Sequence, residues 1–279
     1  MSLNSVNTNR QAVLALQALN DTNSGLSMTQ KRVSTGYRVA DARDDGGAYA
    51  VAQAVRSDVA GVTAVNEQLG GVKGVLQTTF ASLTVVSDTM KQVRAALTRL
   101  ADGAISQDQR NQYQEQYKQL SIQVSQFIDD SKYNGRTLLN TNTAATAGGG
   151  DIRSIRNEEG GSFTISAVDG EGLKLNTTLT FTNADAAKDY LNGEFKDIES
   201  EIATALNRFG SSMQYVENQI SYNSKKNDAL NDGLGALVDA DLAKESANLT
   251  ALQTRQQLGI QTLSLANQGP QVLLSLFRS

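Results

Sequence analysis

The stretch VRSDVAGVTAVNEQLGGVKGVLQTTFASLTVVSDTMKQVRAALTRL, residues 55–100, decides the fold because apolar residues recur in it every seven positions. This pattern, sustained over about six heptads, predicts a long helix that packs against other helices as a coiled coil. Gly70, Gly71 and Gly74 interrupt its sequence, and we interpret them as a place where another helix approaches closely. The two apolar lines of the repeat are Val55, Val62, Leu69, Leu76, Leu83, Met90 and Leu97, and, offset by three, Val65, Val72, Val86, Val93 and Leu100.

Two more helices are predicted on either side of the chain's middle. Ser106 can cap the first, which the turn Asn134-Gly135 is expected to end. The run from Asn231 to Gly235 is expected to end the second. Their apolar residues recur at helical spacing: Tyr113, Tyr117, Leu120, Val124 and Phe127 in one, and Phe195, Ile202, Phe209 and Val216 in the other.

The segment between these helices has a different character. Residues 141–150 (TNTAATAGGG) are of low complexity. Two later runs alternate apolar and polar residues, and Asp169-Gly170 lies between them, which predicts a β-hairpin with its apolar face on a helix. The alternating apolar residues are Phe163 and Ile165 in the first run and Leu173, Leu175, Leu179 and Phe181 in the second.

Both ends of the chain are amphipathic segments with apolar residues on two sides. One partner helix cannot cover two faces, so we expect the ends to pair with each other and to offer the remaining face to other molecules. The line Ala12, Leu19, Leu26 and Val33 marks one face of the first segment. The predicted assembly residues are Leu3, Val6, Val13, Leu14, Leu19, Leu26, Val33, Leu242, Leu249, Leu252, Leu258, Ile260, Leu263, Leu265, Leu276 and Phe277.

The predicted fold class is therefore mainly α: a long coiled-coil helical bundle with paired N- and C-terminal helices and a small β-hairpin insert. Aromatic residues make up only 5% of the 279 residues, which suits thin helical packing. The net charge of −4 argues against nucleic acid as a partner. No stretch approaches the roughly 18 apolar residues of a membrane span, and no secretory signal is recognisable, so neither a membrane partner nor a cleaved leader is expected.

The composition also argues against an enzyme. The chain has no His and no Cys, which excludes the common nucleophile–base pairs and zinc sites, so no catalytic residue, cofactor or metal is expected. The run from Asp41 to Gly46 is only partly similar to a calcium loop. Arg43 stands at its third position and Ala52 at its twelfth, where acidic or amide ligands are needed.

Several short motifs then match one family in order and position. They are VSTGYRV at residues 33–39 followed by ARDD at 42–45, LQTT at 76–79, YNG at 133–135, VDADLAKE at 238–245, and ANQ at 266–268 with LSLFR at 274–278. On these residues the chain resembles bacterial flagellins over most of its length, in particular short alphaproteobacterial ones with a reduced outer domain.

The resemblance implies an architecture and a function. Residues 1–40 and 234–279 would form an inner helical tube, 41–136 and 186–233 a surrounding rod layer, and 137–185 a reduced variable β-hairpin region. The chain would be secreted and would polymerise with copies of itself into the extracellular flagellar filament used for swimming. Implied partners are flagellar junction and cap proteins, an export chaperone and the flagellar type III export apparatus.

Two alternatives and two further expectations accompany this interpretation. A hook–filament junction protein shares the terminal helices, and a coiled-coil adhesin or secreted effector would form closed oligomers. The stretch Gln92-Val93-Arg94-Ala95-Ala96 departs from the R-V-R-E-L of receptor-activating flagellins, which predicts that innate-receptor activation is weak or absent. Hydroxyl-rich composition in the insert is either ordinary loop and strand composition or a set of O-glycosylation sites, at Thr143, Thr146, Ser162, Thr164, Ser166, Thr177 and Thr178.

Overall fold

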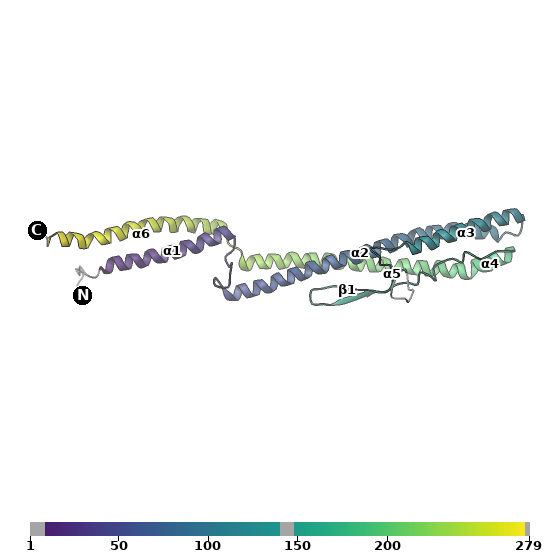
Figure 1. The fold of residues 1–279 in the computed structure, drawn as a ribbon, viewed down its shortest axis with the longest axis horizontal. Helices are drawn as coiled ribbons and strands as arrows, with labels where there is room; N and C mark the ends of the chain where they lie inside the picture. The colour runs from purple at the N-terminus through teal and green to yellow at the C-terminus, as the bar shows by residue number, and fades with distance from the viewer. Residues whose placement is uncertain (1–8, 140–147, 277–279) are drawn as a thin grey trace. The chain divides into compact units, whose positions relative to one another are not determined.

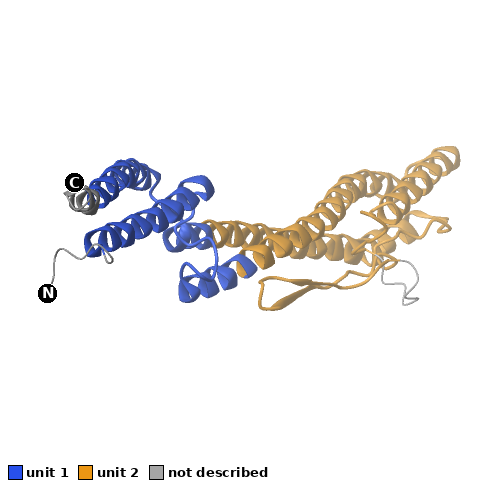
Figure 2. Cartoon of the chain, turned by 60° about the vertical axis from the view of Figure 1, so that its left-hand side comes forward, with its two compact units in different colours: residues 1–57, 229–279 blue, residues 58–228 orange. Residues whose placement is uncertain are grey.

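The computed structural model describes residues 9–139 and 148–276, with side chains up to residue 268 in the last helix. The chain divides into two compact units (Figure 2). Unit 1 combines residues 1–57 with 229–279, and unit 2 is residues 58–228. The mainly α fold with a two-stranded antiparallel sheet is as predicted, and none of the described helices is long and apolar enough to cross a membrane.

Unit 2 is built on the heptad helix. It contains most of α2 (Gly46–Leu100), all of α3 (Gln107–Asp129) and α4 (Ala184–Asn192), and most of α5 (Glu194–Val238). Figure 1 shows α3 lying along α2, and the buried side chains of α2, α3 and α5 form one hydrophobic core. The predicted seam is confirmed, because its residues are almost entirely buried: Leu69, Leu76, Leu83, Val86, Val93 and Leu97 are each 0% exposed.

The predicted start of α3 is confirmed in detail. The Gln109 backbone N–H donates to Ser106 Oγ at 3.3 Å, and the Ser106 N–H donates to Gln109 Oε1 at 3.0 Å. This reciprocal capping box satisfies two N–H groups that a helix start leaves without partners. The helix ends at Asp129, before the Asn134-Gly135 turn that was expected to end it, and that turn joins Tyr133 to Arg136 by two backbone hydrogen bonds.

The predicted hairpin exists, but with a different partner strand. β2 (Ser162–Ile165) pairs antiparallel with β1 (Ile152–Ile155), so the prediction that residues 173–181 form the second strand is wrong. Side chains of α3 bond three backbone groups of that segment instead. Gln114 accepts from the Phe181 N–H at 2.9 Å and donates to the Leu179 carbonyl at 2.6 Å, and the Tyr117 hydroxyl donates to the Asn176 carbonyl at 3.0 Å.

Two expectations about glycines are also wrong. α5 continues through Gly233 and Gly235 to Val238, because neither glycine adopts the left-handed conformation that ends many helices. No helix approaches closely at Gly70 or Gly71, where an added Cβ would meet nothing within 4 Å. Only Gly74 has a close neighbour, which is the ring of Tyr133, at 2.7 Å from the position that a Cβ would occupy.

Unit 1 consists mainly of α1 (Arg10–Thr35) and α6 (Leu242–Leu276), which run side by side (Figure 1). Gly36 ends α1 in a left-handed conformation at φ 76°. Its carbonyl accepts from the Ala240 N–H at 2.9 Å, and Arg38 N–H donates to the Val238 carbonyl at 2.7 Å. These bonds tie the two chain connections together beside a small core of Val39, Ala52 and Val238.

Candidate assembly surface

α1 and α6 form an antiparallel pair. The pairing follows from contacts whose residue numbers rise in one helix as they fall in the other. Leu19 lies 3.1 Å from where a Cβ on Gly259 would be, and Leu252 lies 3.7 Å from the equivalent point on Gly25. Near the far end, Arg32 Nη1 lies 3.2 Å from Glu245 Oε1. The two glycines therefore let the helices approach closely, with a leucine of the partner over each.

Polar contacts also join the two helices. Asn9 Nδ2 donates to the Ala266 carbonyl at 2.7 Å, and Gln256 Nε2 donates to Asn23 Oδ1 at 2.7 Å. Asn9 also caps α1, since its Oδ1 accepts from the Ala12 N–H at 3.1 Å. Together with the leucine contacts, these bonds set the register between α1 and α6 from the Asn9–Ala266 contact to the Arg32–Glu245 contact.

One set of the predicted assembly residues faces the partner helix. Leu26 is only 9% exposed, and the others in the set are half-buried. The heptad line predicted for the first segment is therefore the face that α1 turns toward α6. The set is Leu19, Leu26, Val33, Leu249, Leu252 and Leu263.

A second set is exposed on the α1–α6 pair, and we name the surface that these residues form the outer face, although on α6 it spans more than one side, because Leu258 and Ile260 are only two residues apart. Its members retain half or more of their possible exposure: Val13 64%, Leu14 66%, Leu242 50%, Leu258 55%, Ile260 55% and Leu265 68%. Ile260, which was predicted to share a sector of α6 with Leu252, is exposed, whereas Leu252 is half-buried. Leu16 and Met28 are also exposed, at 47% and 48%, and sequence reasoning missed them, although Met28 follows Leu14 by two heptads.

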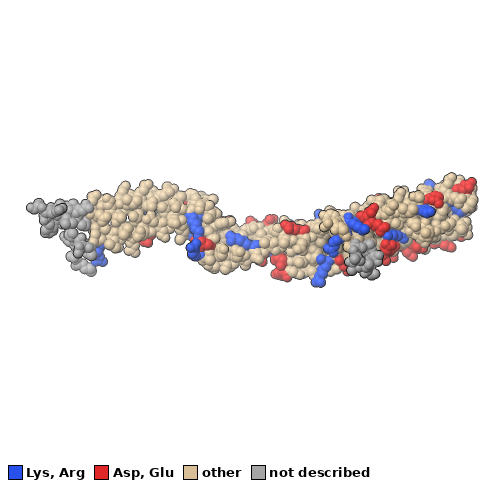
Figure 3. Space-filling view, viewed as in Figure 1, with Lys and Arg blue, Asp and Glu red and all other residues tan. Residues whose placement is uncertain are grey.

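The outer face carries very few charges. Between residues 11 and 30 the only charged residue is Asp21, and between 246 and 276 it is Arg255. Figure 3 shows this part of unit 1 almost free of blue and red on the side in view. A surface that carries exposed leucines and very few charges is typical of a protein–protein contact, because neither partner must desolvate ions.

Some predicted residues fall outside what the structure describes. Leu3, Val6 and Phe277 lie outside the described residues, and so do Thr143 and Thr146 of the insert. Leu276 belongs to α6, but its side chain is outside the described part. Of the remaining hydroxyl residues, Ser162, Thr164 and Thr178 are exposed, whereas Ser166 and Thr177 are half-buried.

Ion pairs stabilise the connection from α1 to α2. Lys31 Nζ lies 2.9 Å from Asp41 Oδ2 and 2.8 Å from Asp44 Oδ2. Hydrogen bonding to the Lys31 ammonium lowers the pKa of both carboxyl groups, and Arg43 adds to the effect at Asp41. These carboxylates are therefore engaged with cations, and no group of three potential metal ligands from His, Cys, Asp and Glu occurs among the described residues.

Comparison with known proteins identifies the family. The family description "Bacterial flagellin N-terminal helical region" matches residues 6–144, and "Bacterial flagellin C-terminal helical region" matches residues 189–277. Flagellin FljK of Caulobacter vibrioides is 35% identical over 100% of both chains. A flagellin of Brucella melitensis biotype 1 is 31% identical, covering 98% of this chain and 99% of the relative.

A solved structure shares the fold at lower identity. It is a candidate flagellar hook-associated protein from Vibrio parahaemolyticus, with a TM-score of 0.57 and 13% identity, and the match covers 70% of this chain and 100% of that one. Likeness at this identity concerns the fold alone, so it does not favour the junction alternative over the flagellin interpretation. The two family regions and the relatives that match from end to end establish that this chain belongs to the bacterial flagellin family.

Proposed function

We propose that this flagellin polymerises into the helical filament of a bacterial flagellum through the outer face of the α1–α6 pair. The observation that carries the proposal is the position of Val13, Leu14, Leu258 and Leu265, which remain mostly exposed although their helices are already paired. Fully burying one such side chain contributes about 1.5–3 kcal/mol. Several of them buried against neighbouring copies supply a large part of a subunit contact.

The contact has to be heterologous, because a filament is an open polymer. A head-to-tail contact that does not close on itself builds a helical filament rather than a ring. Each subunit then meets several neighbours, and the polymer is stable even where one contact is weak. We propose that the α1–α6 pair, within residues 1–40 and 234–279, forms the inner tube and that residues 41–136 and 186–233, most of which belong to unit 2, supply the rod layer.

Seeded elongation tests the assembly surface. Short filament seeds are mixed with monomer, and the critical concentration is measured by sedimentation for Leu258→Gln and Leu265→Gln. We expect each change to raise the critical concentration about tenfold or more, because a leucine lost from a buried contact removes at least about 1.4 kcal/mol. Monomer helicity should not change, since both side chains are exposed in the subunit.

Val85→Gln is the matched control, because Val85 is 45% exposed but lies on α2 in unit 2. Elongation of Leu258→Gln and Leu265→Gln at the wild-type critical concentration would contradict the proposed surface. Closed oligomers in place of filaments, formed by the wild-type chain, would favour the adhesin or effector alternative.

The same proposal implies partners during export and at the ends of the filament. The subunit would pass through the flagellar type III export apparatus with an export chaperone, reach the extracellular filament, and contact junction and cap proteins at its ends. No catalytic role is proposed, and the absence of His and Cys from the chain supports this. Co-purification of the full chain with its export chaperone from cells that cannot export would test the first step.

O-glycosylation of the insert is the alternative to ordinary loop and strand composition. Ser162, Thr164 and Thr178 are the accessible candidates among the described residues. Ser162 Oγ already accepts hydrogen bonds from the Arg153 guanidinium at 3.1 and 3.2 Å, which makes Thr164 and Thr178 the better acceptors for a sugar. An intact mass equal to the sequence mass, on subunits from native filaments, would rule glycosylation out.

A further inference from the structure

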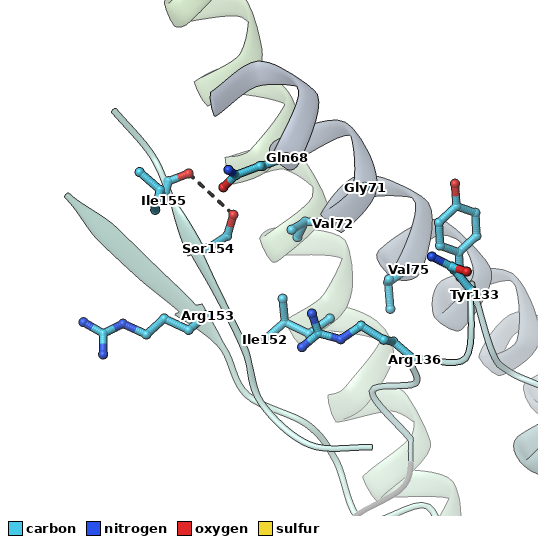
Figure 4. Close-up of a pocket in the computed structure, with 11 residues that line it drawn as sticks. Gln68, Gly71, Val72, Val75, Tyr133, Arg136, Ile152, Arg153, Ser154 and Ile155 are labelled. Atoms are coloured by element: carbon cyan, nitrogen blue, oxygen red, sulfur yellow. Dashed lines mark hydrogen bonds between the residues drawn. The ribbon is translucent and has the colours of Figure 1, made fainter. Parts of the chain in front are cut away.

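Unit 2 has a hollow beside the hairpin that the assembly surface does not use, and we name it the basic hollow. Its volume is about 420 Å³, and it lies between α2, β1 and the turn after α3. Val72, Val75 and Ile152 line it with apolar side chains, and Tyr133 and Arg136 supply its aromatic and charged groups, whereas the side chain of Arg153, at its edge, extends away from it (Figure 4). None of the described residues that line it is acidic.

The composition of the basic hollow suits a protein partner with negative charge. Tyr133 and Ile155 are large apolar residues that remain 45% and 37% exposed. Arg136 forms no ion pair within the described part of the chain, and the neighbouring segment 140–147 contains no acidic residue in its sequence. Tyr and Arg are enriched in the centres of protein interfaces, where a partner desolvates them.

A second hollow on unit 2 has the complementary charge. It has a volume of about 630 Å³ and is lined by α5 and the loop after β2. Asp197 and Glu201 lie on it one helical turn apart, with Asp169 on the loop and Arg208 as the only cation among its described lining residues. Both Asp197 and Glu201 are exposed, and like charges four residues apart destabilise a helix. A cation supplied by another molecule would relieve that repulsion.

The two hollows lie on different elements. No residue lines both, and the basic hollow uses α2 and β1 where the other uses α5. A single subunit can therefore present both surfaces at the same time. Surfaces that are unlike and complementary are what a heterologous contact needs, because each copy donates one and receives the other.

We propose that the basic hollow of one subunit receives the Asp197–Glu201 edge of α5 from a second copy of this chain. The inference rests on the proposed function, since it requires the polymer, but it concerns unit 2 and not the α1–α6 pair. Arg136 would meet a carboxylate of the neighbour, while Tyr133 and Ile155 would be covered. Charge complementarity of this kind fixes the register of a contact and suppresses wrong pairings.

A charge swap in the full chain tests the contact. The critical concentration for seeded elongation is measured for Arg136→Glu, for Glu201→Lys and for both changes in one chain. We expect each single change to raise it about tenfold, because a like-charge pair replaces an attractive one. The double variant should return to within about threefold of wild type, since the reversed charges again attract.

Matched controls exclude a general effect of charge. Glu115→Lys and Lys118→Glu reverse exposed charges on α3, and the pair should show no mutual rescue. Thermal unfolding of each monomer shows whether it is folded. If Arg136→Glu fails to fold, Arg136→Gln with Glu201→Gln replaces the pair, and their effects should be less than additive.

Three results would overturn the contact. Purely additive defects in the double variant would show that Arg136 and Glu201 do not meet. A defect for Arg136→Glu without one for Glu201→Lys would assign a different occupant, such as another acidic segment or a small anion. Failure of the wild-type chain to elongate would overturn the proposed function and this contact together, whereas the first two results leave the proposed function intact.

Discussion

Single glycines on α2 differ in what an added methyl group would meet. A Cβ on Gly70 would meet nothing within 4 Å, whereas one on Gly61 would lie 2.9 Å from Cβ of Glu158 in the hairpin turn. Gly70→Ala should therefore stabilise the monomer by about 0.5–1 kcal/mol through helix propensity. Gly61→Ala should destabilise it by about 1–3 kcal/mol, because the turn is held and must move. Urea unfolding measures both, and effects of the same sign would contradict this account.

Side chains of α5 hold the hairpin turn that packs against Gly61. The Glu158 carboxylate pairs with the Lys226 ammonium, which lowers the pKa of Glu158, and Asn223 Nδ2 donates to the Arg156 carbonyl at 3.2 Å. Several contacts would have to break for the turn to retreat from a methyl group on α2. A residue without a side chain is therefore required at position 61 but not at position 70.

Charge at the α1–α2 connection predicts a loss of stability in acid. The pKa values of Asp41 and Asp44 lie below the usual value of about 3.9 because both accept from Lys31. The unfolded chain therefore binds protons at a higher pH than the folded one, so this contribution is present above about pH 4 and is lost as the pH falls further. We expect Lys31→Met to flatten the decline in helicity below pH 4, measured by circular dichroism.

The matched control for this titration is Lys91→Met. Lys91 pairs with Asp88 on the exposed side of α2, with the two side chains 74% and 64% exposed. Its removal should leave the acid profile of the chain unchanged. A wild-type profile that is as flat as that of Lys31→Met would contradict the assignment to Asp41 and Asp44.

The element that most depends on close packing is the α1–α6 pair. Gly259 faces Leu19, and a larger side chain there would have to occupy the volume of that leucine. We expect Gly259→Leu to weaken the pair by about 1–3 kcal/mol and to raise the critical concentration for elongation, although leucine favours helices. Gly233→Leu on α5 is the control, because an added Cβ there meets nothing within 4 Å.

Helicity and elongation together decide the outcome for Gly259→Leu. Loss of elongation with a drop in monomer helicity places the defect in the α1–α6 pair. Wild-type elongation would mean that Leu19 moves aside without cost. An equal loss for Gly233→Leu would point to a general effect of leucine on the polymer.

The two units differ in the size of their buried cores, so we expect them to differ in stability. Unit 2 holds the large core, whose buried residues run from Val65 to Val216, whereas the separate core in the described part of unit 1 has three buried residues, Val39, Ala52 and Val238. We therefore expect residues 58–228 to fold alone with one cooperative thermal transition and not to elongate filament seeds. Loss of that transition in the isolated segment would contradict an independent core in unit 2.

Much of the fold could be predicted because its determinants are periodic and local. The heptad lines of α2, the capping box at Ser106 and the inward line Leu19, Leu26 and Val33 each follow from side-chain spacing along one helix. Such spacing defines a face without reference to the rest of the chain. The two apolar faces of the terminal helices, and with them the candidate surface, were predictable for the same reason.

The strand pairing was not predictable in this way. Residues 173–181 alternate like a strand, yet three of their backbone groups bond to Gln114 and Tyr117 of α3, and β2 pairs with Ile152–Ile155. For the backbone groups of residues 173–181, a neighbouring strand and the side chains of α3 are alternative hydrogen-bond partners, and these two partners lie far apart in the sequence. Alternation alone shows which side chains are buried, as Leu173, Leu175 and Phe181 are, but not which partner the backbone finds.

The sequence by itself determined the long helices though not all of their ends, their apolar faces, and the family to which the chain is similar, because these depend on residue types at fixed spacing. Only the tertiary structure decided that Ile260 belongs to the outer face, that Gly74 accommodates Tyr133, and that opposite charges line two separate hollows of unit 2. These features arise where segments far apart in the sequence pack against each other. The free energy of that packing depends on the shapes and partners of both segments, which no single stretch of sequence contains.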